Sequence, residues 1–213
     1  LADPQQLTQN KTTISYLGSQ KDNLPFSVVT SDLVARGKFE VTVDALAQGS
    51  QLRSAALALD PAVDAVGSGN LSFSAGGSSF AVAVDPADTL EKIRDKINSA
   101  VDNFGVQANI INTDTGPKLI YSSEVTGTGN DLSVTNDNAS LDQISTAMLS
   151  TKTAQNASIT LDGETLTSST NKFADAISGL NIEVKAETAL GEIATLEIAN
   201  DTEGAEKLIQ EFV

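Results

Sequence analysis

The segment GKFEVTVDALAQGSQL, residues 37–52, combines two patterns that belong to different structural elements. In its first half Phe39, Val41 and Val43 alternate with polar residues, which is the period-2 pattern of a strand with one buried face. Its second half is rich in small residues, glutamine and serine, and it carries leucines at helical spacing together with a glycine that weakens a helix. We therefore expect a strand that ends near Asp44, followed by a segment that leaves the sheet.

The composition excludes several classes of protein. The chain has 213 residues, of which 40% are hydrophobic, and this is enough to bury a core in one or two domains. Its 28 acidic and 13 basic residues give a net charge of −15, which repels nucleic acid and anionic membranes. Cysteine and histidine are absent, which removes disulfides, thiolate nucleophiles and the most common general base and metal ligand. We therefore expect no catalytic residue, cofactor, metal site, nucleic-acid partner or membrane insertion.

The start of the chain does not resemble a signal peptide, and its end interrupts a helical pattern. The sequence has no run of 18 apolar residues, and residues 1–11, LADPQQLTQNK, lack the charged and apolar regions of a signal peptide. The chain starts with Leu1 and stops inside an apolar helical pattern, GAEKLIQEFV, at residues 204–213. We interpret the sequence as a fragment of a longer protein.

Turn formers between alternating apolar residues predict a ββ-α-ββ-β unit over residues 66–137. The segment NLSFSAGGSSFAVAV, residues 70–84, is typical of a hairpin with a Gly-Gly turn. The loop TDTG, residues 113–116, joins a second pair of strands, and DLSVTND, residues 131–137, adds a short one. Between the two hairpins lies the helix predicted for residues 88–101, which can cover one face of an antiparallel sheet.

The predicted helix has a single apolar face. Asp88 is a suitable N-cap, and Glu91 three residues later completes a capping box. Its charged residues lie away from the apolar face, and we expect them to be solvated. The apolar face consists of Leu90, Ile93, Ile97 and Val101.

Strands without a helix predict a second β-rich domain. Asp162 and Gly163 are the strongest hairpin signal in the chain, and residues 180–184 and 194–198 alternate as strands. Residues 173–179 predict a short apolar turn. We pair these strands with the strand at residues 39–43.

The predicted organisation is a discontinuous domain of residues 26–65 and 138–200, with residues 66–137 inserted into it. Residues 1–25 are expected to be irregular, and residues 201–213 to begin a helix. The fold class is α+β, mainly antiparallel β, with two β-rich domains, of which the second carries one covering helix and is inserted into the first.

The carboxylates are the obvious candidates for a chemical site, but their positions favour a structural role. Five of them lie at strand ends or turns, where aspartate is favoured by local hydrogen bonds to the backbone. The segment NDNASLDQ, residues 136–143, lacks the glycine and the closing glutamate of a calcium loop and is expected to be a loop. The five are Asp44, Asp85, Asp114, Asp162 and Asp201.

Several segments, taken in order, resemble the family of bacterial flagellar hook-associated protein 2, the filament cap. They are FEVTVDALAQGSQL, GSGNLSFSAGG with TLEKIRDKINSA, GVQANIINTDTGPKLIYSSEVTG, ASITLDGETLTSSTNKFADAISGLNIEV and NDTEGAEKLIQEFV. The resemblance covers residues 37–213. It implies that the opening segment is the connection out of the first strand of a split domain, and that the helix begun at residues 201–213 leads to a leg domain.

The resemblance also implies a function. The expected protein is an extracellular, non-enzymatic and homo-oligomeric cap that helps exported flagellin insert at the filament tip. It would leave the cell through the flagellar secretion apparatus. Its partners would be copies of itself and flagellin, with other hook-associated proteins as a further candidate. The terminal apolar stripe would serve oligomerisation or leg-domain packing, and it consists of Ala205, Leu208, Ile209 and Phe212.

Two other functions remain open. A β-rich extracellular adhesive or glycan-binding module needs aromatic rings on its surface, and only Tyr16 and Tyr121 represent the Tyr and Trp types. This scarcity favours the cap. An enzyme with a glycosidase-like carboxylate pair ranks third.

Overall fold

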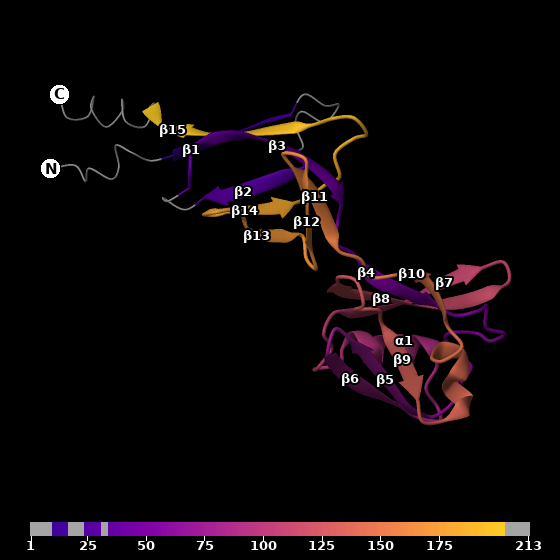
Figure 1. The fold of residues 1–213 in the computed structure, drawn as a ribbon. Coiled ribbons are helices and arrows are strands. Elements are labelled where there is room, and N and C mark those ends of the chain that lie inside the picture. Colours follow the sequence, from indigo (N-terminus) through magenta and orange to yellow (C-terminus); the bar gives the residue numbers. More distant parts are fainter. Residues whose placement is uncertain (1–9, 17–23, 31–33, 203–213) are drawn as a thin grey trace, which may run out of the picture. The chain divides into compact units, whose positions relative to one another are not determined.

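The computed structural model describes residues 10–16, 24–30 and 34–202. These residues form mainly antiparallel sheet with one α-helix, which confirms the predicted α+β class. Contacts between residues divide the chain into two compact units (Figure 1). Unit 1 comprises Leu1–Leu46 and Asn156–Val213, and unit 2 comprises Ala47–Gln155.

Unit 1 contains two antiparallel sheets. The larger one has the strand order β1 (Asn10–Tyr16), β15 (Ala194–Asn200), β3 (Gly37–Ala45), β11 (Ala157–Leu161) and β12 (Glu164–Ser168). The smaller one has the order β13 (Lys172–Ile177), β14 (Leu180–Val184) and β2 (Phe26–Thr30), and it lies alongside the larger sheet (Figure 1). Alternate side chains of both sheets are buried, as in a β-sandwich. They include Phe26, Val41, Val43, Ile159, Ile182 and Leu196.

In the larger sheet, the register shows where the ends of the described chain lie relative to the strands that connect to residues 47–155. Asn10 at the start of β1 pairs with Asn200 at the end of β15. β3 runs antiparallel to β15 and extends past its first residue to Ala45, which pairs with Ser158. The described ends of the chain and the strands that connect unit 1 to residues 47–155 therefore lie at opposite ends of this sheet.

Unit 1 confirms some predicted elements and corrects others. The hairpin of β11 and β12 turns at Asp162 and Gly163, whose φ angles of 47° and 88° lie in the left-handed region. The prediction that residues 1–25 are irregular is wrong, because β1 lies within this region of the chain. β1 gave a weak signal because its inward positions include Asn10 and Thr12, and its pairing with β15 supplies the hydrogen bonds.

The apolar turn predicted at residues 173–179 is also wrong, since β13 runs from Lys172 to Ile177. The register between β13 and β14 shifts between Phe173 and Ile177, and Asp175 has a φ of 48°. This irregularity breaks the period-2 pattern that identifies a strand.

Unit 2 contains two further antiparallel sheets and the helix. One sheet has the order β10 (Leu149–Lys152), β4 (Gly49–Arg53), β8 (Gly116–Thr126) and β7 (Val106–Thr113), and the other has the order β6 (Ser78–Val84), β5 (Gly69–Ala75) and β9 (Ser133–Asn136). In the core, Phe73 stacks on Phe80 with ring centroids 4.7 Å apart and meets Tyr121 edge-on at 5.2 Å. Both hairpins predicted from their turns, β5–β6 and β7–β8, are confirmed.

The division at residues 46 and 155 corrects the predicted limits of 66 and 137. β4 pairs with β8, and β10 pairs with β4, so both strands belong to the sheets of unit 2. Gln48 and Gln155 bond to each other through both backbone amides, with N–O distances of 3.1 and 3.0 Å. The predicted limits omitted these strands because β4 and β10 have no alternating apolar pattern of their own.

The helix α1 (Leu90–Asn98) differs from its prediction at both ends. Its N-cap is Thr89, whose side chain accepts a hydrogen bond from the Lys92 amide, so Asp88 is not the cap. The apolar face consists of Leu90, Ile93 and Ile97 only, since Val101 lies beyond the helix and is 98% exposed. The segment predicted as a loop at residues 136–143 contains most of a 3₁₀ helix, Ala139–Ile144, that buries Leu141 and Ile144.

Candidate assembly surface

The predicted terminal stripe cannot be placed in the fold. Ala205, Leu208, Ile209 and Phe212 lie outside the described residues. Their role in oligomerisation or leg-domain packing stays a prediction.

The turn carboxylates bond to neighbouring strands or to the helix α1. Asp44 accepts a hydrogen bond from the Thr160 hydroxyl at 2.8 Å, and Asp162 accepts one from the Glu40 amide at 2.7 Å. Asp85 forms an ion pair of 2.8 Å with Lys96. Within residues 10–16, 24–30 and 34–202, no group of three or more acidic side chains is arranged to hold a metal ion.

Asp88 and Lys96 form a clamp between the loop before α1 and the last turn of the helix. The Lys96 ammonium donates to the buried Asp88 carboxylate, which also accepts from the Asp85 amide at 2.8 Å. Burial raises the pKa of Asp88, but the hydrogen bond from Lys96 and the one from the Asp85 amide lower it by more, so the pKa lies below its ordinary value. This clamp corrects the expectation that all helix charges are simply solvated.

The outward face of the β10-β4-β8-β7 sheet is the most distinctive surface of unit 2. The inward face is formed by residues such as Ala108, Leu119 and Tyr121, which are buried in the core. Side chains alternate along a strand, and directly paired residues of antiparallel strands share one face. Lys118 therefore points outward with Ile111, its partner on β7.

The register extends this outward face across all four strands. Leu149 pairs with Arg53, Arg53 with Ile120, and Ile120 with Asn109. The next row consists of Lys152, Gln51, Ser122 and Gln107. In that row the Gln51 amide donates to the Ser122 hydroxyl at 3.1 Å, and its oxygen accepts from Thr151 at 2.9 Å. We call these outward side chains, together with Lys118 and Ile111, the basic sheet face.

The basic sheet face concentrates the positive charge of an acidic protein. Unit 2 has six Lys and Arg residues, three of which lie on this face, while the other three lie on α1. Arg53, Lys118 and Lys152 form no ion pair with a described carboxylate. Glu124 also faces outward on β8, six residues or about 20 Å from Lys118. Two exposed apolar residues accompany the cations, Ile111 at 49% and Leu149 at 61% exposure.

Sequence reasoning missed the basic sheet face, although part of its signal is visible. The alternation in KLIYSSE, residues 118–124, places Lys118 and Ile120 on one side of a strand. Arg53 and Lys152 are about a hundred positions apart in the chain, and only strand pairing brings them together.

Comparisons with known proteins agree with this architecture. The family profile described as "Flagellar hook-associated protein 2 C-terminus" matches residues 154–213, and the profile described as "Flagellin hook IN motif" matches residues 70–138. A crystal structure of FliD (HAP2) from Pseudomonas aeruginosa PAO1 is 31% identical, with a TM-score of 0.77 over 89% of this chain and 91% of that chain. This chain belongs to the flagellar hook-associated protein 2 family.

Other members of the hook-associated protein 2 family are similar over nearly the whole chain. The flagellar hook-associated protein 2 of Aeromonas caviae is 34% identical over 96% of this chain and 46% of the relative. The D1-D2-D3 domains of the flagellar cap protein FliD from Escherichia coli give a TM-score of 0.75 at 28% identity, over 99% of this chain and 60% of that one. The chain thus spans about half the length of its curated relatives. In the described part of the chain, no helix has the length and apolar character needed to cross a membrane.

Proposed function

We propose that the chain is the β-rich part of a flagellar filament cap, which assembles from copies of itself and promotes the insertion of exported flagellin. The observation that carries this proposal is the match to the P. aeruginosa FliD structure over most of both chains. The cap would lie outside the cell at the distal end of the filament, and it would be exported by the flagellar secretion apparatus. Other hook-associated proteins are a further candidate partner.

A structural role fits the surfaces of the chain better than an enzymatic one. The turn carboxylates Asp44 and Asp162 bond to groups of adjacent strands, and Asp85 pairs with Lys96 of the helix α1. The basic sheet face offers exposed charge and apolar surface without a catalytic arrangement. We therefore propose that the protein acts by assembly and not by catalysis.

The adhesive alternative lacks the rings that it needs. The Tyr121 ring is buried in the core of unit 2, with its hydroxyl bonded to the Ile144 carbonyl at 2.9 Å. Tyr16 is also buried, and its hydroxyl donates to Glu192 at 2.5 Å. Neither tyrosine presents an open face on which a sugar could stack.

Complementation tests the cap function. A bacterium that lacks its own cap gene would receive the full-length gene that contains this chain. We expect the full-length gene to restore filaments and swimming and to reduce the loss of flagellin to the medium. If the full-length protein is exported and stable but flagellin still escapes and filaments stay absent, the proposed function is wrong.

A further inference from the structure

An exposed turn in unit 2 has the opposite character to the basic sheet face. Residues 60–64, DPAVD, form what we call the acidic turn, in which Asp60, Val63 and Asp64 are exposed. Val63 is 72% exposed and stands between the two carboxylates in sequence. The acidic turn thus combines negative charge with an apolar side chain, whereas the basic sheet face combines positive charge with Ile111 and Leu149.

Hydrogen bonds hold the acidic turn in a fixed conformation. The Asp60 amide donates to one Asp64 carboxylate oxygen at 2.7 Å, and the Asp64 amide donates to the Asp60 carbonyl at 3.0 Å. The Ala62 amide donates to the Asp60 carboxylate at 3.0 Å. The Glu91 amide of α1 donates to the Pro61 carbonyl at 3.0 Å, which fixes the turn to the helix. A turn held in this way loses little conformational entropy when it binds.

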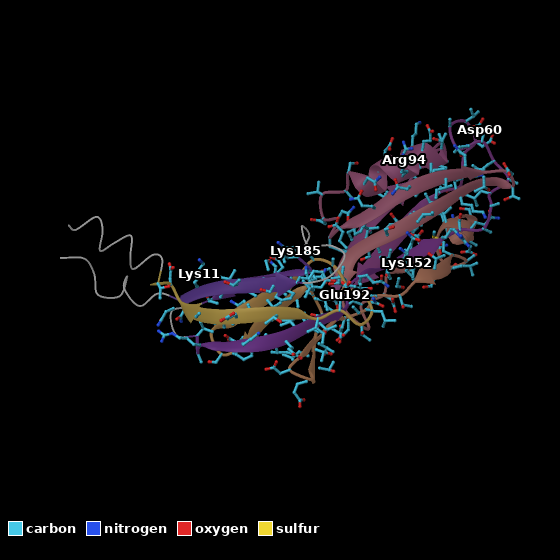
Figure 2. All side chains as sticks on the ribbon, turned by 90° about the horizontal axis from the view of Figure 1, so that it is seen from above. Lys11, Asp60, Arg94, Lys152, Lys185 and Glu192 are labelled. Atoms are coloured by element: carbon cyan, nitrogen blue, oxygen red, sulfur yellow. The ribbon has the colours of Figure 1, made fainter. Side chains whose placement is uncertain are left out.

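The charges of the acidic turn are available for a partner. Neither Asp60 nor Asp64 forms an ion pair with a described lysine or arginine, and each has one carboxylate oxygen outside the turn's hydrogen bonds. The turn and the basic sheet face belong to the same unit, but Figure 2 shows Asp60 well separated from Lys152. Within the described residues, neither Asp60 nor Asp64 is ion-paired with Arg53, Lys118 or Lys152, so the turn does not neutralise the face of its own molecule.

We propose that the acidic turn of one copy binds the basic sheet face of a second copy, with Asp60 and Asp64 facing Arg53 and Lys118 and with Val63 against the exposed Ile111 and Leu149. Complementary charge supports this choice, because the chain carries −15 overall and most of its remaining surface would repel a second acidic copy. The contact joins two different surfaces, so successive copies add in one direction and close into a ring or continue as a helix. The inference rests on the proposed self-assembly of the cap.

Charge reversal on each surface tests the contact. One variant carries Arg53→Glu and Lys118→Glu, and the other carries Asp60→Lys and Asp64→Lys. In a solution of either variant alone, the acidic turn and the basic sheet face carry charges of the same sign. We therefore expect the association constant, measured by sedimentation velocity at low salt, to fall about tenfold or more. In an equimolar mixture, every contact between the two different variants has opposite charges, and association should return to within about threefold of the parent.

Two further variants make the test specific. Lys38→Glu with Lys185→Glu changes the net charge equally at exposed positions of unit 1, and it should associate like the parent. Val63→Ser leaves both carboxylates and the turn's hydrogen bonds in place, and it should weaken association several-fold. This variant tests the contact even if the lysine substitutions disturb the turn, and circular dichroism checks that each variant is folded.

Several outcomes would overturn the inference. The inference is wrong if the parent stays monomeric at all concentrations, or if the folded reversal variants associate like the parent. It is also wrong if the mixture remains dissociated. A loss with the Lys38 and Lys185 control as large as that with the face variant would also overturn it. If the parent restores swimming while the reversals alter neither association nor motility, the cap function stands and this contact is wrong. If the mixture associates as expected but complementation fails, the contact stands and the proposed function is wrong.

Discussion

The Asp88 carboxylate is a buried charge whose position depends on one lysine, Lys96, eight residues further along the chain. The hydrogen bond from Lys96 and the one from the Asp85 amide together outweigh the effect of burial, so the pKa of Asp88 is lower in the folded protein than in the unfolded chain. The ionised carboxylate therefore stabilises the fold above the unfolded pKa, near 4, and this contribution is lost as the pH falls through the folded pKa.

Asp88→Asn should lower the free energy of unfolding by about 1–2 kcal/mol at pH 7, because it leaves Lys96 without its most buried partner. The difference from the parent should shrink as the pH falls through the folded pKa of Asp88, because the parent carboxylate then becomes protonated. Urea unfolding followed by circular dichroism at several pH values measures both effects. Asp95→Asn is the control, since Asp95 pairs only with the neighbouring Arg94 on the helix surface, and it should change stability by less than about 0.5 kcal/mol. A difference between Asp88→Asn and the parent that stays the same size throughout acidification would contradict this reasoning.

At the scale of elements, local signals could be predicted from the sequence and pairing between distant segments could not. The hairpin turns at Gly76 and Gly77 and at Asp162 and Gly163 are encoded by residues that accept positive φ, and both were predicted. β1 was missed because its partner β15 lies far along the chain. The basic sheet face was missed for the same physical reason, since its cations come from separate strands that only the register aligns.

The β11–β12 hairpin allows a test of one such turn. Asp162 has a φ of 47°, and its carboxylate accepts a hydrogen bond from the Glu40 amide. Asp162→Val should therefore destabilise unit 1 by about 1–3 kcal/mol, through backbone strain and the loss of this hydrogen bond. Asp162→Asn keeps the acceptor and tolerates this conformation, so it should cost much less. Thermal unfolding of the two variants compares them directly. Equal melting temperatures for both would show that the turn does not limit the stability of this hairpin.

At the scale of the whole molecule, we propose that unit 2 is an autonomous domain inserted into unit 1. Residues 47–155 contain both sheets, the helix and a core that includes Phe73, Ile93 and Tyr121. Expressed alone, this segment should give dispersed amide signals in NMR and unfold in one cooperative transition.

The segment of residues 66–137 is the matched comparison for that experiment. It lacks β4 and β10, so one edge of β8 loses its hydrogen-bonded partner. We expect it to be markedly less stable or to aggregate. Equal stability of the two segments would place the boundary back at the limits that the turn signals predicted.

The pairing of Asn10 with Asn200 determines how unit 1 responds to tension. A force that separates these two residues acts first on the hydrogen bonds beside them and only later on those near Tyr16 and Ala194. The hydrogen bonds between β1 and β15 therefore break one after another, because the force acts on only one bonded pair at a time. Such a geometry yields at low force whatever the equilibrium stability of the sandwich. A chain drawn by one end into a narrow channel would lose its outer strand pair stepwise before the rest of the sheet opened.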